Sequence, residues 1–202
     1  MIFENKDQLK KGCEAILAWD DVDVRILDAG RFQDKLIDDL ISTVVFSPDE
    51  GIKEAAGWLI RRGAAALGIH SASIQPLYEA MGRKDVVGFT VPAINIRGMT
   101  YDVAQAVFRA ALKGGVGPVI FEIARSEIDY TRQRPFEYTC AVTAAAVKTG
   151  WRGPVFLQGD HFQMNAKKFA ADAEKETQTV KNLIWEAIEA GFYNLDIDTS
   201  TL

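Results

Sequence analysis

The sequence has little cysteine, no long apolar run and no excess of basic residues. Its two cysteines, Cys13 and Cys140, lack CxxC spacing and a secretory setting, which excludes a disulfide scaffold and favours free thiols. No apolar stretch approaches the roughly 18 residues of a membrane span, and the N-terminus lacks the basic and apolar regions of a signal peptide. We therefore expect a cytoplasmic protein.

The formal net charge of -5 at pH 7 argues against any general attraction to nucleic acid or to an anionic membrane. An anionic substrate would have to be held by a local group of residues. What the chain does have is 48% hydrophobic and 25% charged residues in 202, which is typical of a globular protein with one substantial core.

The first part of the chain has helical apolar spacing. Residues 1 to about 85 are predicted as helices with connecting loops, and residues 1–72 as a helical N-terminal extension. The run from Ala64 to Ile69 fits either a buried helix end or a short buried strand. A further helix is predicted from Ser73 to Met81, with Gly82 as its stop.

From Val86 onward the pattern changes to strands that alternate with helices. The strands are predicted at residues 86–96, 118–124, 154–160 and 194–200, and the helices at 100–113, at 136–148 and up to about Ala190. Apolar strands separated by helices are typical of βα units on a parallel sheet. Four such strands cannot close a barrel that needs eight, so either another chain completes the sheet or the chain is a fragment, which we favour.

The most informative stretch follows the third predicted strand, where Gly159 is succeeded by Asp160 and His161. Ligands bind at the carboxyl ends of strands in parallel α/β folds. There a neutral imidazole can bind a divalent metal, and a carboxylate can remove a proton from a carbon next to a carbonyl. Adjacent residues of a strand point to opposite faces, so both side chains reach one site only if the strand ends at Gly159.

Each of these polar residues also has a simpler interpretation. Asp160 could cap a helix beside a surface histidine. Asp198 and Ser200 could cap the turn after the fourth strand, and Asn95 could be a turn residue after the first.

The basic residues near the strand ends are open to two interpretations as well. Arg97 and Arg125 could anchor a phosphate or carboxylate, although isolated arginines are more often solvated. The pair Lys167-Lys168 fits a solvated face or a phosphate contact.

Four segments in order resemble the first half of a class II, zinc-dependent fructose-bisphosphate/tagatose-bisphosphate aldolase barrel. They are Phe89-Thr90-Val91-Pro92-Ala93-Ile94-Asn95, Gly117-Pro118-Val119-Ile120-Phe121, Gly159-Asp160-His161 and Asp196-Ile197-Asp198-Thr199-Ser200. The resemblance covers roughly residues 73–202. It implies a partial TIM barrel, α/β in class, made of the first four βα units behind the N-terminal extension.

The resemblance also implies a chemistry. Asp160 would be the proton-transferring catalytic residue and His161 a ligand of Zn²⁺ or another divalent metal, while Asn95, Asp198 and Ser200 would bind substrate. The reaction would be aldol cleavage or condensation of a phosphorylated ketose, without a lysine Schiff base.

The departures from the family pattern leave alternatives open. The family usually has a serine at the end of the second strand, where this chain has Ala124-Arg125-Ser126, and further zinc ligands come from strands beyond the fourth. Residues 159–165 and 121–126, with Tyr130-Thr131, also resemble the non-catalytic accessory subunit of tagatose-bisphosphate aldolase. A sugar-phosphate-binding barrel without turnover is a further alternative. The expected partners are a phosphorylated sugar, no nucleic acid, no membrane, and either a homo-oligomer or the missing half of the barrel. We expect the isolated chain to bind zinc weakly and to lack aldolase activity.

Overall fold

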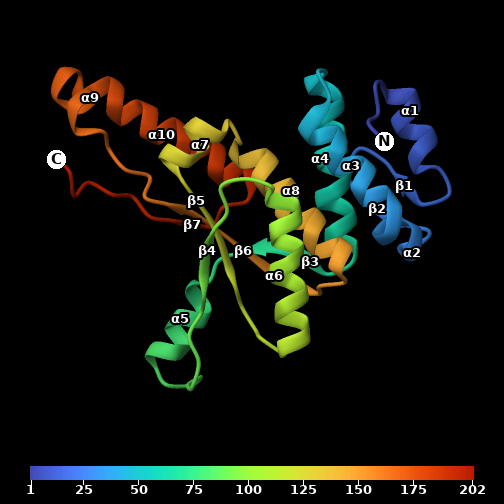
Figure 1. Ribbon diagram of the computed structural model, residues 1–202, viewed down its shortest axis with the longest axis horizontal. Helices are drawn as coiled ribbons and strands as arrows, with labels where there is room; N and C mark the ends of the chain where they lie inside the picture. The colour runs from blue at the N-terminus through green and yellow to red at the C-terminus, as the bar shows by residue number, and fades with distance from the viewer. The chain divides into compact units, whose positions relative to one another are not determined.

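The computed structural model describes residues 1–202 and shows a mixed α/β fold, in which helices flank a parallel sheet (Figure 1). No helix is long and apolar enough to cross a membrane. The chain divides into two units, of which the first consists of Met1–His70, Met99–Val116 and Cys140–Val155, and the second of the remaining segments. The segments of the second unit are Ser71–Gly98, Gly117–Thr139 and Phe156–Leu202.

The first unit is mainly helical. Its elements are α1 (Lys6–Cys13), β1 (Leu17–Trp19), β2 (Val24–Ile26), α2 (Ala29–Arg31), η1 (Phe32–Leu36), α3 (Ile37–Phe46), α4 (Glu50–Ala66) and α6 (Thr100–Gly114). Phe32, Ile37 and Ile60 are buried in its core. A Cβ atom at Gly63 would meet the Phe32 ring at 2.6 Å, so this glycine lets the ring pack directly on α4.

The expectation of helices with connecting loops in residues 1 to 85 was wrong at residues 17–26. β1 and β2 form an antiparallel hairpin, and β3 (Ile69–Ala72) follows α4. The hairpin strands have three residues each, too few to show an alternating pattern. The ambiguous run that starts at Ala64 contains both alternatives, because α4 ends at Ala66 and the strand begins at Ile69.

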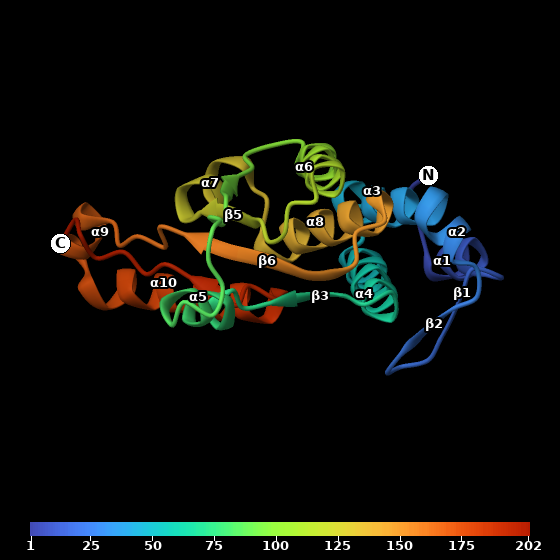
Figure 2. The ribbon, with the colours of Figure 1, turned by 90° about the horizontal axis from the view of Figure 1, so that it is seen from below.

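The second unit carries most of the sheet. Its strands are β4 (Ala93–Asn95), β5 (Ile120–Ala124), the later part of β6 (Gly153–Asp160) and β7 (Asn194–Leu195), and its helices are α5 (Gln75–Gly82), α7 (Arg125–Thr131), the start of α8 (Pro135–Thr149), α9 (Ala166–Ala171) and α10 (Ala173–Ala190). The strand order is β3-β6-β5-β4, and β7 pairs with β6. β4, β5, β6 and β7 pair in parallel, and α7 and α10 lie on opposite sides of β6 (Figure 2).

The register places a polar row across one face of this sheet. Asn95 pairs with Glu122, Glu122 with Gln158, and Gln158 with Asn194. Side chains in register on parallel strands point to the same face. The neighbouring row, in which Phe121 pairs with Leu157, is apolar and buried and faces the other way.

Two residues closer to the start of each strand, the same face of the sheet is apolar. Ile120 and Phe156 are register partners that pack with Ile74, and Leu77 of α5 covers this cluster. The polar side chains thus gather toward the carboxyl ends of the strands, whereas α5 lies toward their starts (Figure 1).

Two strand predictions were too long. The first strand covers 93–95 instead of 86–96, because the preceding residues include exposed Val87 and Phe89 and have no partner strand. The fourth covers 194–195 instead of 194–200, because β6, its partner, ends at Asp160. Beyond that point only irregular backbone hydrogen bonds continue, such as that from Phe162 N to Asp196 O.

Candidate functional site

The turn that brings Asp160 and His161 together lies one residue later than the sequence suggests. β6 continues through Asp160, and His161 adopts a left-handed backbone conformation with a φ of 45°. This conformation is uncommon for a residue with a side chain, and it turns the chain so that the two side chains meet. Gly159 serves packing instead, because a Cβ atom there would meet Phe162 at 2.6 Å and Leu195 at 2.8 Å.

The two side chains form a hydrogen-bonded pair. Nδ1 of His161 lies 2.9 Å from Oδ1 of Asp160, and the imidazole is 61% exposed, against 19% for the carboxylate. The hydrogen bond to Asp160, followed by the charge of the same carboxylate, raises the pKa of His161 above its ordinary value. Nε2 is the imidazole nitrogen that the pair does not use.

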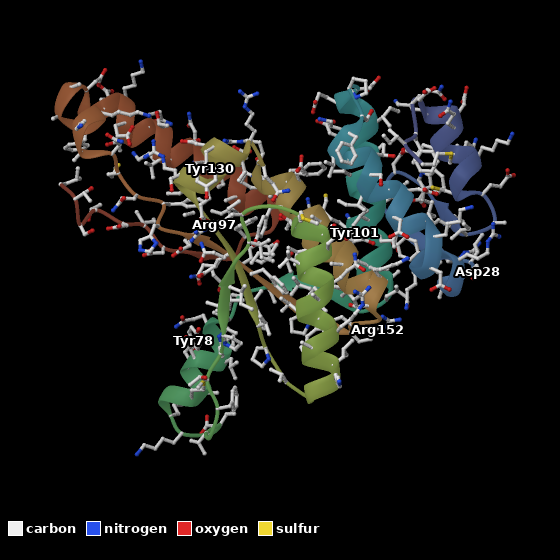
Figure 3. The ribbon with its side chains drawn as sticks, viewed as in Figure 1. Asp28, Tyr78, Arg97, Tyr101, Tyr130 and Arg152 are labelled. Carbon is white, nitrogen blue, oxygen red and sulfur yellow. The ribbon has the colours of Figure 1, made fainter.

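Asn95 joins this pair from β4 and is itself oriented by a buried carboxylate. Its Nδ2 donates to Oδ2 of Asp160 at 3.2 Å and to Oε2 of Glu127 at 2.9 Å. Glu127 also accepts the Ala124 backbone N–H at 2.8 Å and pairs with Arg97, which lies beyond β4 (Figure 3). Arg97 thus forms an ion pair with a carboxylate of the chain itself, while 63% of its side chain stays exposed.

Glu122 is a further carboxyl group on the polar row. It is only 8% exposed and accepts a hydrogen bond from Nε2 of Gln158 at 2.9 Å. Burial, followed by the charges of Asp160 and Glu127, raises its pKa. The sheet face therefore has carboxyl groups in two different environments, a partly exposed one at Asp160 and a buried one at Glu122.

Asp196 completes a group that could hold a metal ion. One ligand atom each of Asp160, His161 and Asp196 lies within 4.8 Å of the others, and Oδ2 of Asp196 also accepts the His161 backbone N–H at 3.3 Å. Two ligand atoms bound to one ion at about 2.1 Å each are at most about 4.2 Å apart, so these atoms would have to move slightly closer together to bind one ion. One imidazole with carboxylates fits a divalent cation that accepts mixed nitrogen and oxygen ligands, such as Zn²⁺ or Mn²⁺.

The structure places Asp198 and Ser200 outside this group. Oδ1 of Asp198 accepts the Ser200 backbone N–H at 2.8 Å, as expected of a turn cap, and Oδ2 accepts from Nε2 of Gln163 at 2.7 Å. The hydrogen bonds from Ser200 and then from Gln163 lower the pKa of Asp198. Asp198 thus holds the turn after β6, and Asp196 lies nearer to the His161 ring.

A buried ion pair also stabilises the turn that follows β6. Nη1 of Arg125 donates to the Gln163 carbonyl at 2.7 Å and to Oε1 of Glu176 at 2.5 Å, and that oxygen also accepts the Asn165 backbone N–H at 2.8 Å. The two side chains are only 10% and 2% exposed. Arg125, one of the two candidate anchors, is therefore already engaged by α10 through one nitrogen.

Sequence reasoning brought together Asp160, His161 and Asn95, and the structure has them in contact. It did not single out Glu122, Glu127 or Asp196. One signal for Glu122 was present, since a carboxyl in the middle of the apolar run Ile120–Ala124 has to face something polar. Glu127 and Asp196 depend on the register between strands, which the sequence does not contain.

Comparison with known proteins adds no assignment, since no family model, no curated protein and no solved structure matches the chain.

Proposed function

We propose that the protein is a metal-dependent lyase of the class II aldolase type, acting on a phosphorylated ketose of the fructose- or tagatose-bisphosphate kind. The observation that carries this proposal is the meeting of Asp160, His161 and Asn95 at the carboxyl ends of neighbouring parallel strands. The choice of substrate rests on the resemblance of the strand-end segments to that family. The general type of chemistry rests on the residues themselves.

In this proposal Asp160 moves the proton. Its two oxygens accept hydrogen bonds from His161 and Asn95, and a carboxylate retains further lone pairs for a substrate C–H. Asn95, fixed by Glu127, would orient Asp160 and the substrate. His161 and Asp196 would hold a divalent cation, which when bound supplies polarisation of the substrate carbonyl.

We also propose that the sheet is part of a TIM barrel. The support is the difference between its two faces. One has a polar row above the apolar cluster of Ile74, Ile120 and Phe156, as a barrel interior would, and the other is apolar and buried.

The test is cleavage of fructose and tagatose bisphosphates by the intact protein with Zn²⁺. We expect Asp160→Ala to abolish turnover while metal remains bound, and Asp102→Ala, which removes an exposed carboxylate of α6, to be neutral. An intact protein that cleaves no ketose bisphosphate even with zinc would overturn the proposal. The isolated 202-residue chain is expected to show no turnover.

A non-catalytic accessory subunit is the second candidate, and one observation favours it. The candidate metal group contains a single imidazole, whereas catalytic zinc sites commonly have two or three. This candidate predicts that a pull-down recovers a second aldolase chain and that the Asp160→Ala variant still supports its turnover. Loss of the partner's turnover in that variant would contradict the accessory role.

A further inference from the structure

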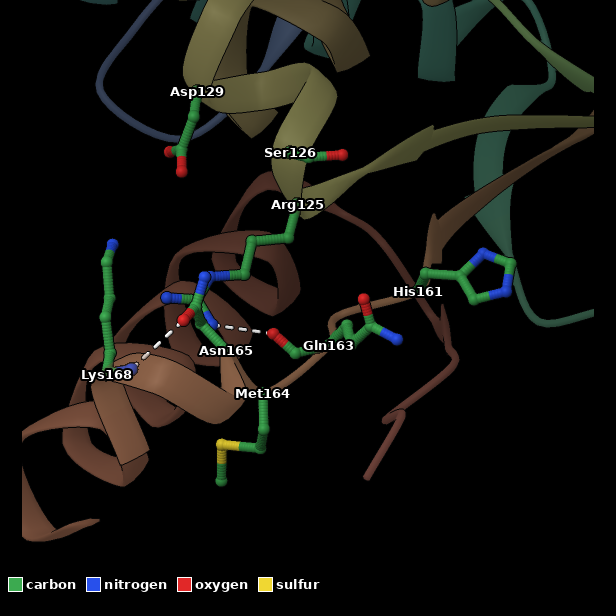
Figure 4. A pocket seen from close by; sticks show the side chains of 8 residues that line it. All are labelled: Arg125, Ser126, Asp129, His161, Gln163, Met164, Asn165 and Lys168. Atoms are coloured by element: carbon green, nitrogen blue, oxygen red, sulfur yellow. Dashed lines mark hydrogen bonds between the residues drawn. The ribbon is translucent and has the colours of Figure 1, made fainter. Parts of the chain in front are cut away.

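We propose that a cavity behind the Asp160–His161 turn is a second site, which binds a phosphate monoester. The cavity, here called the α7–α9 pocket, has a volume of about 140 Å³, several times the roughly 30 Å³ of one water molecule. It is lined by Arg125, Ser126, Asp129, Gln163, Asn165 and Lys168, together with His161 and Met164 (Figure 4). All of these residues belong to the second unit.

Arg125 is the central donor of the pocket. A guanidinium has five N–H groups, and both hydrogen bonds of Arg125, to Gln163 and to Glu176, come from Nη1. Nε and Nη2 remain without an acceptor from the chain, and neither nitrogen is sealed from solvent. An arginine that is only 8% exposed and bonded through one nitrogen is suited to present its other edge to an oxyanion.

Lys168 and Asn165 provide further donors in the lining of the pocket. Oδ1 of Asn165 accepts the Lys168 backbone N–H at 3.0 Å, which leaves the Asn165 amide NH₂ to donate. The Lys168 ammonium forms no ion pair, and its side chain extends toward α7 (Figure 4). Together with the exposed Ser126, the lining donors thus come from α7 and from α9 with its N-cap residue Asn165. The three oxygens of a phosphate monoester match such an arrangement better than the two of a carboxylate.

The charges of the pocket make the proposal easy to test. Glu176 neutralises Arg125, so Lys168 supplies the attraction for an anion. Asp129 of α7 lines the same cavity and repels an anion. Removal of either charge should therefore change the affinity for phosphate, in opposite directions.

The pocket does not depend on the proposed aldolase function. His161 lines the pocket, but its ring points away from Lys168 and Asp129 (Figure 4), and Asp160 is not a lining residue. The donors proposed for the anion therefore include neither Asp160 nor a proposed metal ligand. The phosphate could belong to the substrate or to a separate molecule. Both sources present the same chemistry to the pocket.

The experiment is a titration of the metal-free chain with inorganic phosphate and with glycerol phosphate, followed by calorimetry. We expect Lys168→Gln to weaken binding by at least about five-fold and Asp129→Asn to strengthen it by a similar factor, because two unit charges about 4 Å apart in water interact by about 1 kcal/mol and phosphate carries more than one charge. Lys167→Gln is the matched control, because this exposed neighbour does not line the pocket. Binding should persist in Asp160→Asn and be far weaker for acetate.

Absence of phosphate binding, or equal losses in Lys168→Gln and Lys167→Gln, would overturn the proposal, since equal losses indicate only surface attraction. Competition between a ketose bisphosphate and phosphate, with a raised KM in Lys168→Gln, would identify the substrate as the source. Binding without such competition would support a separate phosphorylated ligand.

Discussion

Replacement of Glu176 by glutamine tests whether the Arg125–Glu176 pair holds the turn that carries His161. The substitution keeps the shape of the side chain but leaves Arg125 without a counter-charge at a site where the two side chains are 10% and 2% exposed. Breaking a buried ion pair from one side costs about 3–5 kcal/mol, and the remaining amide oxygen of glutamine places the expected loss near the lower figure. For a chain of this size, 3 kcal/mol corresponds to a fall in Tm of about 6–12 °C.

The assay is thermal unfolding combined with amide hydrogen exchange of the turn after β6. Because Oε1 of Glu176 accepts the Asn165 N–H and Arg125 donates to the Gln163 carbonyl, exchange at Asn165 should accelerate more than in β5. The double variant Arg125→Met/Glu176→Met should regain most of the lost stability, since no unpaired charge remains. A decrease in Tm of less than about 2 °C for Glu176→Gln would refute this reasoning, as would a double variant that is less stable than either single variant.

Three further predictions concern the same region. The hydrogen bond from Arg125 lowers the pKa of Glu176 in the folded protein. The stability that this carboxylate contributes is therefore complete above the ordinary glutamate pKa of about 4.3 and is lost as the pH falls through the lower pKa of the folded state. Acid titration of unfolding should show this loss in the wild type and not in Glu176→Gln. Asp160 raises the pKa of His161, so Asp160→Asn should lower the pKa of this imidazole. An NMR titration measures this pKa, and the variant His70→Gln identifies which histidine signals belong to His161. An unchanged pKa would contradict the hydrogen-bonded pair. Gly159→Ala should lower the free energy of unfolding by about 1–3 kcal/mol, because the new Cβ atom would meet Phe162 at 2.6 Å. The control Gly82→Ala, where no atom lies within 4 Å, should be close to neutral. Equal effects of the two substitutions would exclude the packing role of Gly159.

Much of the chain after residue 93 could be predicted because its strands are apolar and its helices have clear stops. The helix predicted at residues 100–113 is α6, which extends to Gly114, and the third strand, predicted at 154–160, is β6, which starts at Gly153. Both elements have strong local signals. Short elements did not, and the three-residue strands β1 and β2 were missed.

The site was predictable only where one segment of sequence contains its residues. Asp160 and His161 stand together after an apolar run, and Asn95 ends one. In contrast, Glu122 and Gln158 become neighbours through the register of β5 and β6, and the φ of 45° at His161 decides which side chains meet. Both features depend on the assembled sheet, so no local sequence pattern predicts them. The same dependence brings Asp196, which no local pattern singled out, into one group with Asp160 and His161.

The most direct test of the proposed site is calorimetric titration of the chain with Zn²⁺ and with Mn²⁺. We predict binding of a single ion that is lost in His161→Ala, weakened in Asp196→Asn, and unchanged in the control His70→Ala, because His161 and Asp196 supply the proposed ligands. Undiminished binding in His161→Ala would contradict the metal site and, with it, the aldolase proposal.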